Sequence, residues 1–391
     1  MLTGEAKRWI DSAADDMVFP CSWSGGSAKD FGLWQEQTRD VLRTDLGTMP
    51  AHVDANVAVV ASETRNGYSA RLLAFDVDRV FRTQAYLLVP DGPGPFPAIL
   101  GLHDHGAFYR WGKEKLVRSS VSSHPALAEF VRRHYGGRFV ADELARWGYA
   151  VIVADQWLWG EQRQTDLPGI RGVELGTREG VAEYNAACAE LERQVAYAML
   201  FCGRTLPGQM LFADLRTLDV LLEQPEVDAE RVGCVGLSVG AFRAVHLAAV
   251  DQRVSAAVAV GWMVSLDDYI RGHDHLYRWP NVIGLCTPGM VRHLDYPDLV
   301  GLACPRPFLL AAGRQDDLYP LEAVQSSFRA IKDIYASRGC SQSVATIWYD
   351  VPHCFDVAMQ EEAFLWLDRW LRPSGSTHTG EFPQDANGSS S

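Results

Sequence analysis

The chain has 391 residues, of which 47% are hydrophobic and 22% are charged, as in a globular protein with an ample core. Its net charge of −13 argues against nucleic acid or an anionic membrane surface as a partner. No stretch approaches the roughly 18 uninterrupted apolar residues of a membrane span, and the first residues lack an apolar segment of signal-peptide length, so neither a span nor a leader is expected.

The first hundred or so residues comprise an N-terminal extension and then a series of strands. Residues 1–55 combine helix and loop signals and are expected to form an extension packed on the main domain. Strand patterns follow at 57–62, 71–75 and 80–89. A turn cluster, Pro-Asp-Gly-Pro-Gly-Pro, then leads to residues 98–102, which are continuously apolar, as is typical of a strand buried on both faces.

The rest of the chain alternates helices and strands. Helices are expected at 139–147, 181–202, 210–222, 241–250, 321–335 and 361–371, and strands at 149–154, 232–237, 254–260, 308–312 and 344–349. This alternation predicts an α/β fold over residues 56–371, with a mostly parallel, doubly wound sheet and helices on both faces.

Two segments depart from the alternation. Residues 262–305 are rich in aromatic and polar side chains and are expected to form a cap or pocket wall at the C-terminal edge of the sheet, where ligands bind in open α/β sheets. The alternative is a structural excursion without a role in binding. Residues 372–391 have almost nothing to bury and are expected to be disordered.

A Gly-x-Ser-x-Gly pattern directly follows the apolar strand pattern at 232–237. It reads Gly236-Leu237-Ser238-Val239-Gly240 and is followed by a helix pattern. A strand-to-helix turn of this kind is so tight that the positions flanking the serine must lack side chains, and it exposes a strained serine over the sheet edge. Ser238 is therefore the expected nucleophile; the alternative is an ordinary turn.

A serine hydroxyl needs a base, normally histidine, and the base needs an orienting carboxylate. In folds with this turn the chain order is serine, acid, histidine. Only His353 and His378 follow the last predicted strands, and His378 lies in the expected disordered tail. His353 follows the strand at 344–349 and is the expected base; the alternative is a loop histidine bonded to backbone.

The acid is expected after the strand at 308–312. There the sequence reads Gly313-Arg-Gln-Asp316-Asp317-Leu-Tyr-Pro320. The spacing from Gly313 and to Pro320 favours Asp316 as the acid, with Asp317 as the alternative. The aspartate that is not the acid is expected to be solvated or to lie at a helix N-terminus.

The negative charge that forms on an attacked carbonyl needs preorganised N–H donors. The Val239 N–H, at the start of the helix after Ser238, is one expected donor. The loop after residues 98–102 reads His103-Asp104-His105-Gly106-Ala107, and the Ala107 N–H is the expected second donor. A metal site on this loop is disfavoured, because His103 and His105 alternate along extended chain and no further ligand set completes a shell.

Aromatic residues at the strand ends are candidates for the pocket. They suit an apolar or sugar-like substrate, although each could equally be part of the core. The candidates are His105, Tyr109, Trp157, Trp159 and Trp262. Glu161 and Arg163 could pair with each other or hold a polar substrate.

The motifs His105-Gly106, Gly236-Leu237-Ser238-Val239-Gly240, Asp316 and His353 occur in the order found in α/β-hydrolases, and the chain resembles that superfamily over residues 55–371. Residues 85–90, 97–100, 102–106, 112–115 and 225–233 resemble the dienelactone-hydrolase and acetyl-xylan-esterase-like branch. Dienelactone hydrolases carry a cysteine nucleophile, so that activity is not implied, and Ala241 stands where many members have a second glycine. The resemblance implies hydrolysis of a carboxylic ester or lactone without a cofactor.

The expected partner is thus a small-molecule ester or lactone, and the sequence is compatible with a homodimer. The eight cysteines form no C-x-x-C motif or compact set, which favours free thiols and a cytoplasmic location. An acyltransferase, a thioesterase or a peptidase would use the same three side chains. A non-catalytic binding protein of this fold is disfavoured, because such proteins commonly lose one of the three.

Overall fold

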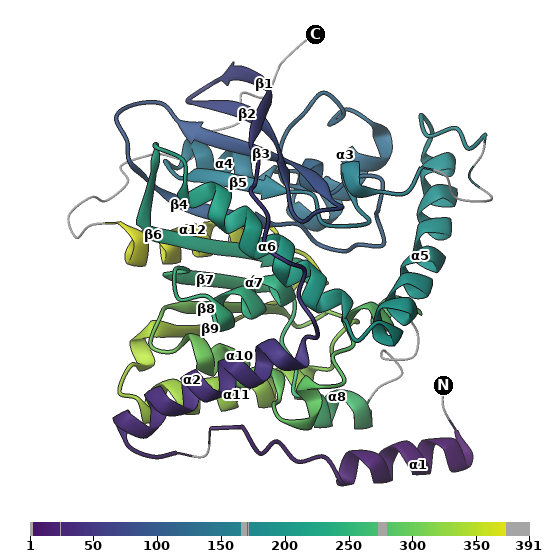
Figure 1. Cartoon of the computed structure of the whole chain (residues 1–391), viewed down its shortest axis with the longest axis vertical. Helices are drawn as coiled ribbons and strands as arrows, with labels where there is room; N and C mark the ends of the chain where they lie inside the picture. Colours follow the sequence, from purple (N-terminus) through teal and green to yellow (C-terminus); the bar gives the residue numbers. More distant parts are fainter. Residues whose placement is uncertain (1–2, 24, 166–169, 171, 273–279, 373–391) are drawn as a thin grey trace.

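A computed structural model describes residues 3–23, 25–165, 170, 172–272 and 280–372 (Figure 1). Its strands are β1 (Ala58–Arg65), β2 (Tyr68–Asp76), β3 (Arg82–Pro90), β4 (Phe96–Leu102), β5 (Ala150–Ala154), β6 (Val227–Leu237), β7 (Ala256–Val260), β8 (Phe308–Gly313) and β9 (Val344–Tyr349). They form one sheet in the order β1-β2-β3-β5-β4-β6-β7-β8-β9. Pairing is antiparallel from β1 to β5 and parallel from β5 to β9. The predicted mostly parallel α/β sheet is confirmed.

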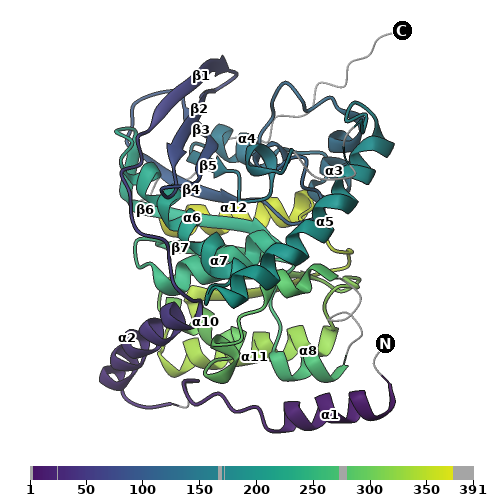
Figure 2. The same ribbon diagram turned by 45° about the vertical axis from the view of Figure 1, so that its right-hand side comes forward.

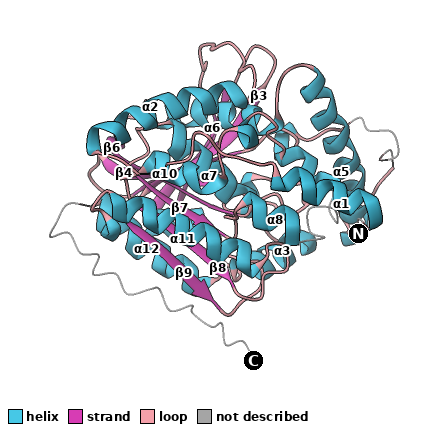
Figure 3. Ribbon diagram, turned by 90° about the horizontal axis from the view of Figure 1, so that it is seen from below, coloured by secondary structure: helices cyan, strands magenta, loops and turns pink. Residues whose placement is uncertain are grey.

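The sheet lies between two layers of helices (Figure 3). The helices are α1 (Gly4–Asp15), α2 (Ala28–Asp45), α3 (Pro125–Tyr135), α4 (Val140–Arg146), α5 (Arg178–Phe201), α6 (Leu206–Leu222), α7 (Val239–Val250), α8 (Leu266–Gly272), α10 (Tyr296–Ala303), α11 (Leu321–Ser337) and α12 (Val357–Leu371). One core cluster joins a face of the sheet to α2, α6, α7, α10 and α11. A second joins the other face to α3, α4 and α12.

The central strands are apolar along their whole length because both of their faces are covered. Every residue of β5, β7 and β8 is buried. Strand β1, at the sheet edge, is exposed on both faces except at its last residue. Continuous apolar runs therefore identified the central strands, whereas α3 was not predicted and β6 begins five residues before the predicted 232.

Helix α2 anchors the N-terminal segment to helices α7 and α10, which cover one face of the sheet. Its Arg39 donates from Nε to the Ala249 carbonyl at 2.9 Å and from Nη2 to the Leu302 carbonyl at 2.6 Å. These carbonyls lie in the last turns of α7 and α10, where backbone acceptors lack partners within the helix. Helix α1 buries only Ala14 and contacts α8, where Arg271 pairs with Asp15 at 2.6 Å.

The segment 262–305 is only partly separate from the helical layers. It begins with core residues, and α10 packs between α7 and α11. The short helix η3 (Pro280–Leu285) instead packs on α5, which runs down the right-hand side of Figure 1 and comes to the front in Figure 2. The predicted cap therefore stays a prediction for α8 and η3, and its residues 273–279 lie outside the described part. The predicted disordered tail lies outside it as well, except for Arg372.

Within the described residues, every helix is too short or too polar to cross a membrane.

Candidate active site

Ser238 lies at the junction of β6 and α7, where the nucleophile is expected. Its backbone has φ 57° and ψ −119°, a conformation that a residue with a side chain adopts only under constraint. Its N–H donates to the Val260 carbonyl of β7 at 2.8 Å, which fixes the turn to the neighbouring strand. The serine thus sits at the carboxyl edge of the sheet and caps the N-terminus of a twelve-residue helix.

The flanking glycines are required by close backbone contacts. A Cβ on Gly236 would lie 2.3 Å from the carbonyl carbon of Gly240, and one on Gly240 would lie 2.0 Å from the Leu102 carbonyl oxygen at the end of β4. The turn therefore packs directly on the start of the loop that is expected to carry the second oxyanion donor.

His353 and Asp316 are joined across the loops that follow β9 and β8. His353 Nδ1 lies 2.6 Å from Asp316 Oδ2, and the two side chains are 14% and 6% exposed. The other carboxyl oxygen of Asp316 accepts the Leu318 N–H at 2.9 Å. Asp317 points to solvent. With Nδ1–H donated to Asp316, Nε2 is the ring atom left to act as a base.

Ser238 and His353 approach the same peptide segment. Ser238 bonds to Val260, and a Cβ on the next residue, Gly261, would lie 3.2 Å from Cε1 of His353. Tyr319 lies beside both, with its ring 6.1 Å from that of His353 and its hydroxyl within reach of the Ser238 hydroxyl. Among the described residues, no hydrogen bond joins Ser238 Oγ to His353 directly, as is common before a substrate binds.

The two expected oxyanion donors differ in their surroundings. Val239 is the first residue of α7, where backbone N–H groups have no partner within the helix. The Ala107 N–H is donated to His105 Nδ1 at 2.9 Å, so an oxyanion would have to displace this ring. Ala107 itself is exposed at the site, with φ 48°.

The residues of this loop that were considered for a metal site are hydrogen-bonded to other parts of the protein. His103 donates from Nδ1 to the Asp104 carbonyl at 2.9 Å and accepts the Gln156 N–H at Nε2. Asp104 accepts the Tyr135 hydroxyl at 2.5 Å, and the buried ammonium of Lys115 bonds to the Asp104 carbonyl at 2.8 Å. In the part of the chain that is described, no three His, Cys, Asp or Glu side chains are grouped to hold a metal ion. These residues brace the loop.

The predicted pocket aromatics fall into two groups. His105, Tyr109 and Trp159 form a cluster beside the loop, with Tyr109 stacked on Trp159 at 5.0 Å between ring centres and His105 edge-on to Trp159 at 4.9 Å. Trp262 is 5% exposed and packs edge-on against Phe242, while Tyr109 and Trp159 are 0% and 1% exposed, so all three rings are covered. Trp262 also borders a small cavity of about 20 Å³ that Asp316 and Tyr319 line.

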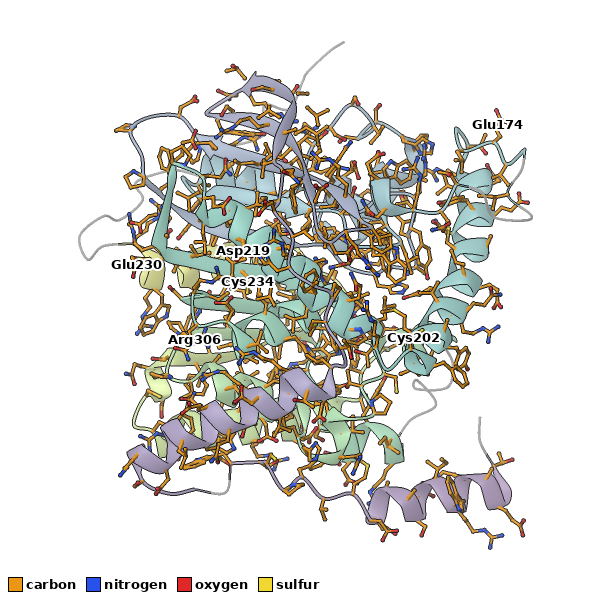
Figure 4. All side chains as sticks on the ribbon, in the orientation of Figure 1. Glu174, Cys202, Asp219, Glu230, Cys234 and Arg306 are labelled. Atoms are coloured by element: carbon orange, nitrogen blue, oxygen red, sulfur yellow. The ribbon has the colours of Figure 1, made fainter. Side chains whose placement is uncertain are left out.

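The remaining candidates lie farther out. Trp157 packs on Phe81 at 5.1 Å and lines a separate groove of about 830 Å³ beside α5. Glu161 and Arg163 form a loose ion pair at 3.8 Å. Cys202, at the lower end of α5, also lines this groove, while Glu174 lies near the upper end of the helix (Figure 4).

Two residues at the site were not identified from the sequence. Glu192 of α5 accepts from His105 and Tyr109, and Tyr319 lies beside Ser238. Burial raises the pKa of Tyr319 well above its usual value. The position of Tyr319 just after the predicted acid was a usable signal. Glu192 had none, because it is 87 positions from His105 in the sequence.

Comparisons with known proteins show the family and the fold of the chain. A family model described as the Abhydrolase family matches residues 15–333, which include Ser238 and Asp316 but not His353. A curated Bacillus subtilis (strain 168) protein, "Putative hydrolase YtaP", is 24% identical over 341 residues, which are 86% of this chain and 99% of that protein.

Solved structures share the fold. A "putative acetyl xylan esterase" from Bacteroides fragilis NCTC 9343 superposes with a TM-score of 0.67 at 17% identity, covering 89% of this chain and 83% of the other. A glucuronoyl esterase from Solibacter usitatus superposes with a TM-score of 0.59 at 14% identity, covering 90% and 99%. At these identities the likeness concerns the fold.

Proposed function

This chain belongs to the Abhydrolase family, and from that premise we propose that it is a serine hydrolase that cleaves a carboxylic ester or lactone through an acyl-enzyme on Ser238. The observation that carries the proposal is the Asp316–His353 hydrogen bond of 2.6 Å beside the strained turn of Ser238. A buried carboxylate that holds Nδ1 of an imidazole leaves Nε2 available as the base, and acyl transfer requires such a base close to the serine. Ser238 and His353 both lie against the Val260–Gly261 segment.

The proposed reaction has two halves. His353 Nε2 accepts the Ser238 proton as Oγ attacks the carbonyl carbon, and Asp316 stabilises the imidazolium that forms. The Val239 N–H and a donor of the loop 103–109 hold the oxyanion, and removing one such donor typically costs about 3–4 kcal/mol of transition-state stabilisation. His353 then protonates the leaving alcohol, and a water molecule repeats the sequence on the acyl-enzyme.

The substrate class is proposed from proteins that share the fold, because the aromatic rings beside the loop are covered. Tyr109 and Trp159 are 0% and 1% exposed. Two proteins of the same fold are named for esters of carbohydrates, which supports including acetylated sugars and glucuronate esters among the first substrates to test. The reaction as proposed needs no cofactor or metal.

A substrate panel tests the proposal. The panel comprises p-nitrophenyl acetate and butyrate, lactones, acetylated sugars, glucuronate esters, thioesters and aminoacyl-arylamides. We expect ester or lactone turnover that is lost in Ser238→Ala while the variant stays folded. Turnover of thioesters or arylamides alone would favour a thioesterase or a peptidase. Unchanged turnover in the folded Ser238→Ala variant would contradict the proposal.

We also propose a cytoplasmic location. All eight cysteines are unpaired in the structure, which fits a reducing, cytoplasmic compartment.

A further inference from the structure

Glu192 is a buried acidic residue that links helix α5 to the loop beside Ser238. Its side chain is 1% exposed. The carboxyl group lies 2.9 and 3.1 Å from His105 Nε2 and accepts the Tyr109 hydroxyl at 2.5 Å. On its other side, a Cβ on Gly284 would lie 2.9 Å from Oε1, so the backbone of η3 closes over the carboxyl group. Glu192 thus contacts both the loop and the segment after β7.

The hydrogen bonds determine the tautomer of His105. The Ala107 N–H donates to Nδ1 at 2.9 Å, so Nδ1 carries no proton. In the neutral ring the proton is then on Nε2, which faces Glu192. Two hydrogen bonds therefore connect Glu192 to Ala107 through His105. The Glu192 carboxyl group accepts from Nε2 and orients the ring, and Nδ1 of the ring accepts the Ala107 N–H.

That N–H belongs to a strained part of the loop. Gly106 and Ala107 have φ values of 58° and 48°, and Ala107 is not a glycine. A residue with a side chain is unfavourable in the left-handed region and needs contacts that hold it there. The His105 bond closes this turn, and the Trp159 ring, 4.9 Å from His105, keeps the imidazole in place.

The effect of Glu192 also extends to Tyr109. Burial first, and the Glu192 carboxyl group second, raise the pKa of Tyr109 well above its usual value, so its hydroxyl remains a donor. Tyr109, Trp159 and Val239 share one apolar cluster, which connects this anchor to the helix that begins after Ser238.

We propose that Glu192 is a positioning residue for catalysis, which through His105 keeps the 105–107 turn folded beside the start of α7, where the Val239 N–H is the expected oxyanion donor. This inference rests on the proposed function. Since a displaced turn disturbs the groups around Ser238 and Val239, which act on the charge that forms in the transition state, loss of Glu192 lowers kcat far more than it changes KM.

Two variants of Glu192 and one control test the inference. Glu192→Ala should lower kcat about 10- to 100-fold with KM changed less than about threefold, the size of effect that a displaced catalytic group produces. Glu192→Gln, whose amide oxygen can still accept from His105, should stay within about fivefold of the wild type. The control is Glu190→Gln, an exposed residue of the same helix that bonds to Arg193, and it should behave as wild type.

A double variant separates positioning from general stabilisation. If Glu192 acts through His105, then Glu192→Ala combined with His105→Ala loses no more activity than the more damaging single change. Losses that multiply, or a Glu192→Ala enzyme with wild-type kcat, would overturn the inference.

Hydrogen–deuterium exchange of the amides of residues 105–109 provides a readout that does not need activity. We expect faster exchange in Glu192→Ala than in Glu190→Gln, and unchanged exchange would overturn the inference. Faster exchange in a chain without Ser238-dependent turnover would mean that the proposed function has failed while the link from Glu192 to the loop stands.

Discussion

Asp316 Oδ2 lies 2.6 Å from His353 Nδ1, whereas the adjacent Asp317 points to solvent. The difference arises from the loop after β8. Its backbone is joined to the β9 end by N–H bonds from Arg314 to Tyr349 and from Gln315 to Val351, at 2.7 and 3.1 Å. These bonds turn Asp316 inward to the imidazole and leave the next residue outside.

The two aspartates therefore provide a matched test of the acid. Asp316→Asn should lower kcat by up to about 10⁴-fold, because an amide cannot stabilise the imidazolium or select the same tautomer. Asp317→Asn should stay within about twofold of the wild type. Steady-state kinetics on the best ester of the panel measures both. Equal losses in the two variants would show that another carboxylate orients His353.

The glycines of the nucleophile turn should be intolerant of any side chain. Gly240→Ala places a Cβ 2.0 Å from the Leu102 carbonyl oxygen, and the backbone must move to relieve it. We expect a loss of about 3 kcal/mol or more in the free energy of unfolding, together with loss of activity. Urea denaturation measures the first.

Gly32→Ala is the control for this substitution. Gly32 is in helix α2, has no atom within 4 Å of an added Cβ, and has an ordinary helical backbone. The change should stabilise the protein by about 0.5–1 kcal/mol through helix propensity. A Gly240→Ala variant as stable as this control would refute the close packing of the turn on β4.

His246 should make the fold sensitive to acid. It is 1% exposed on α7, Nδ1 lies 2.8 Å from the Phe242 carbonyl oxygen, and burial lowers its pKa to about 4. The unfolded chain, with a histidine pKa of about 6.5, binds the proton more readily, so stability is full above pH ~6.5 and falls as the pH drops towards 4. The loss from this group is on the order of 3 kcal/mol by about pH 4.

His246→Phe isolates this contribution. The phenyl ring fits an aromatic neighbourhood, since Phe242 lies 4.0 Å away between ring centres, and it does not titrate. The free energy of unfolding, measured from pH 7 to 4, should fall less steeply in the variant than in the wild type. Parallel curves for the two proteins would show that His246 is not the group responsible.

Chelation should leave activity unchanged. His103 and His105 both have hydrogen-bond partners on their two ring nitrogens, so neither is poised as a ligand. Assays before and after EDTA treatment check this. Inactivation that zinc reverses would revive the metal site that the sequence analysis disfavoured.

Much of the fold was predictable because central strands of a parallel sheet are covered on both faces and read as unbroken apolar runs. The strand at 344–349 was predicted with the ends that the structure shows. The turn of Ser238 was recognisable because its two glycines avoid steric clashes that any side chain would cause. The strand order, with β5 between β3 and β4, was not predicted, since local pattern carries no information on it.

The site was less predictable where it depends on contacts between distant segments. The hydrogen bond from His353 to Asp316 agrees with the spacing that favoured Asp316, and the roles of both residues stay predictions. Two further hydrogen bonds depend on how helix α5 packs over the loop. The Ala107 N–H donates to His105, and His105 bonds to Glu192 of α5. The burial of Trp262, which is 5% exposed and packs against Phe242 of α7, also depends on a contact between distant segments.

The most direct test of the account is to treat the protein with a fluorophosphonate and map the adduct by peptide mass spectrometry. The account predicts one stoichiometric adduct on Ser238, formed rapidly in the wild type and at least about 100-fold more slowly in His353→Ala, since the base is needed to activate the hydroxyl. An adduct on another residue, or a folded wild-type protein that forms none, would contradict it.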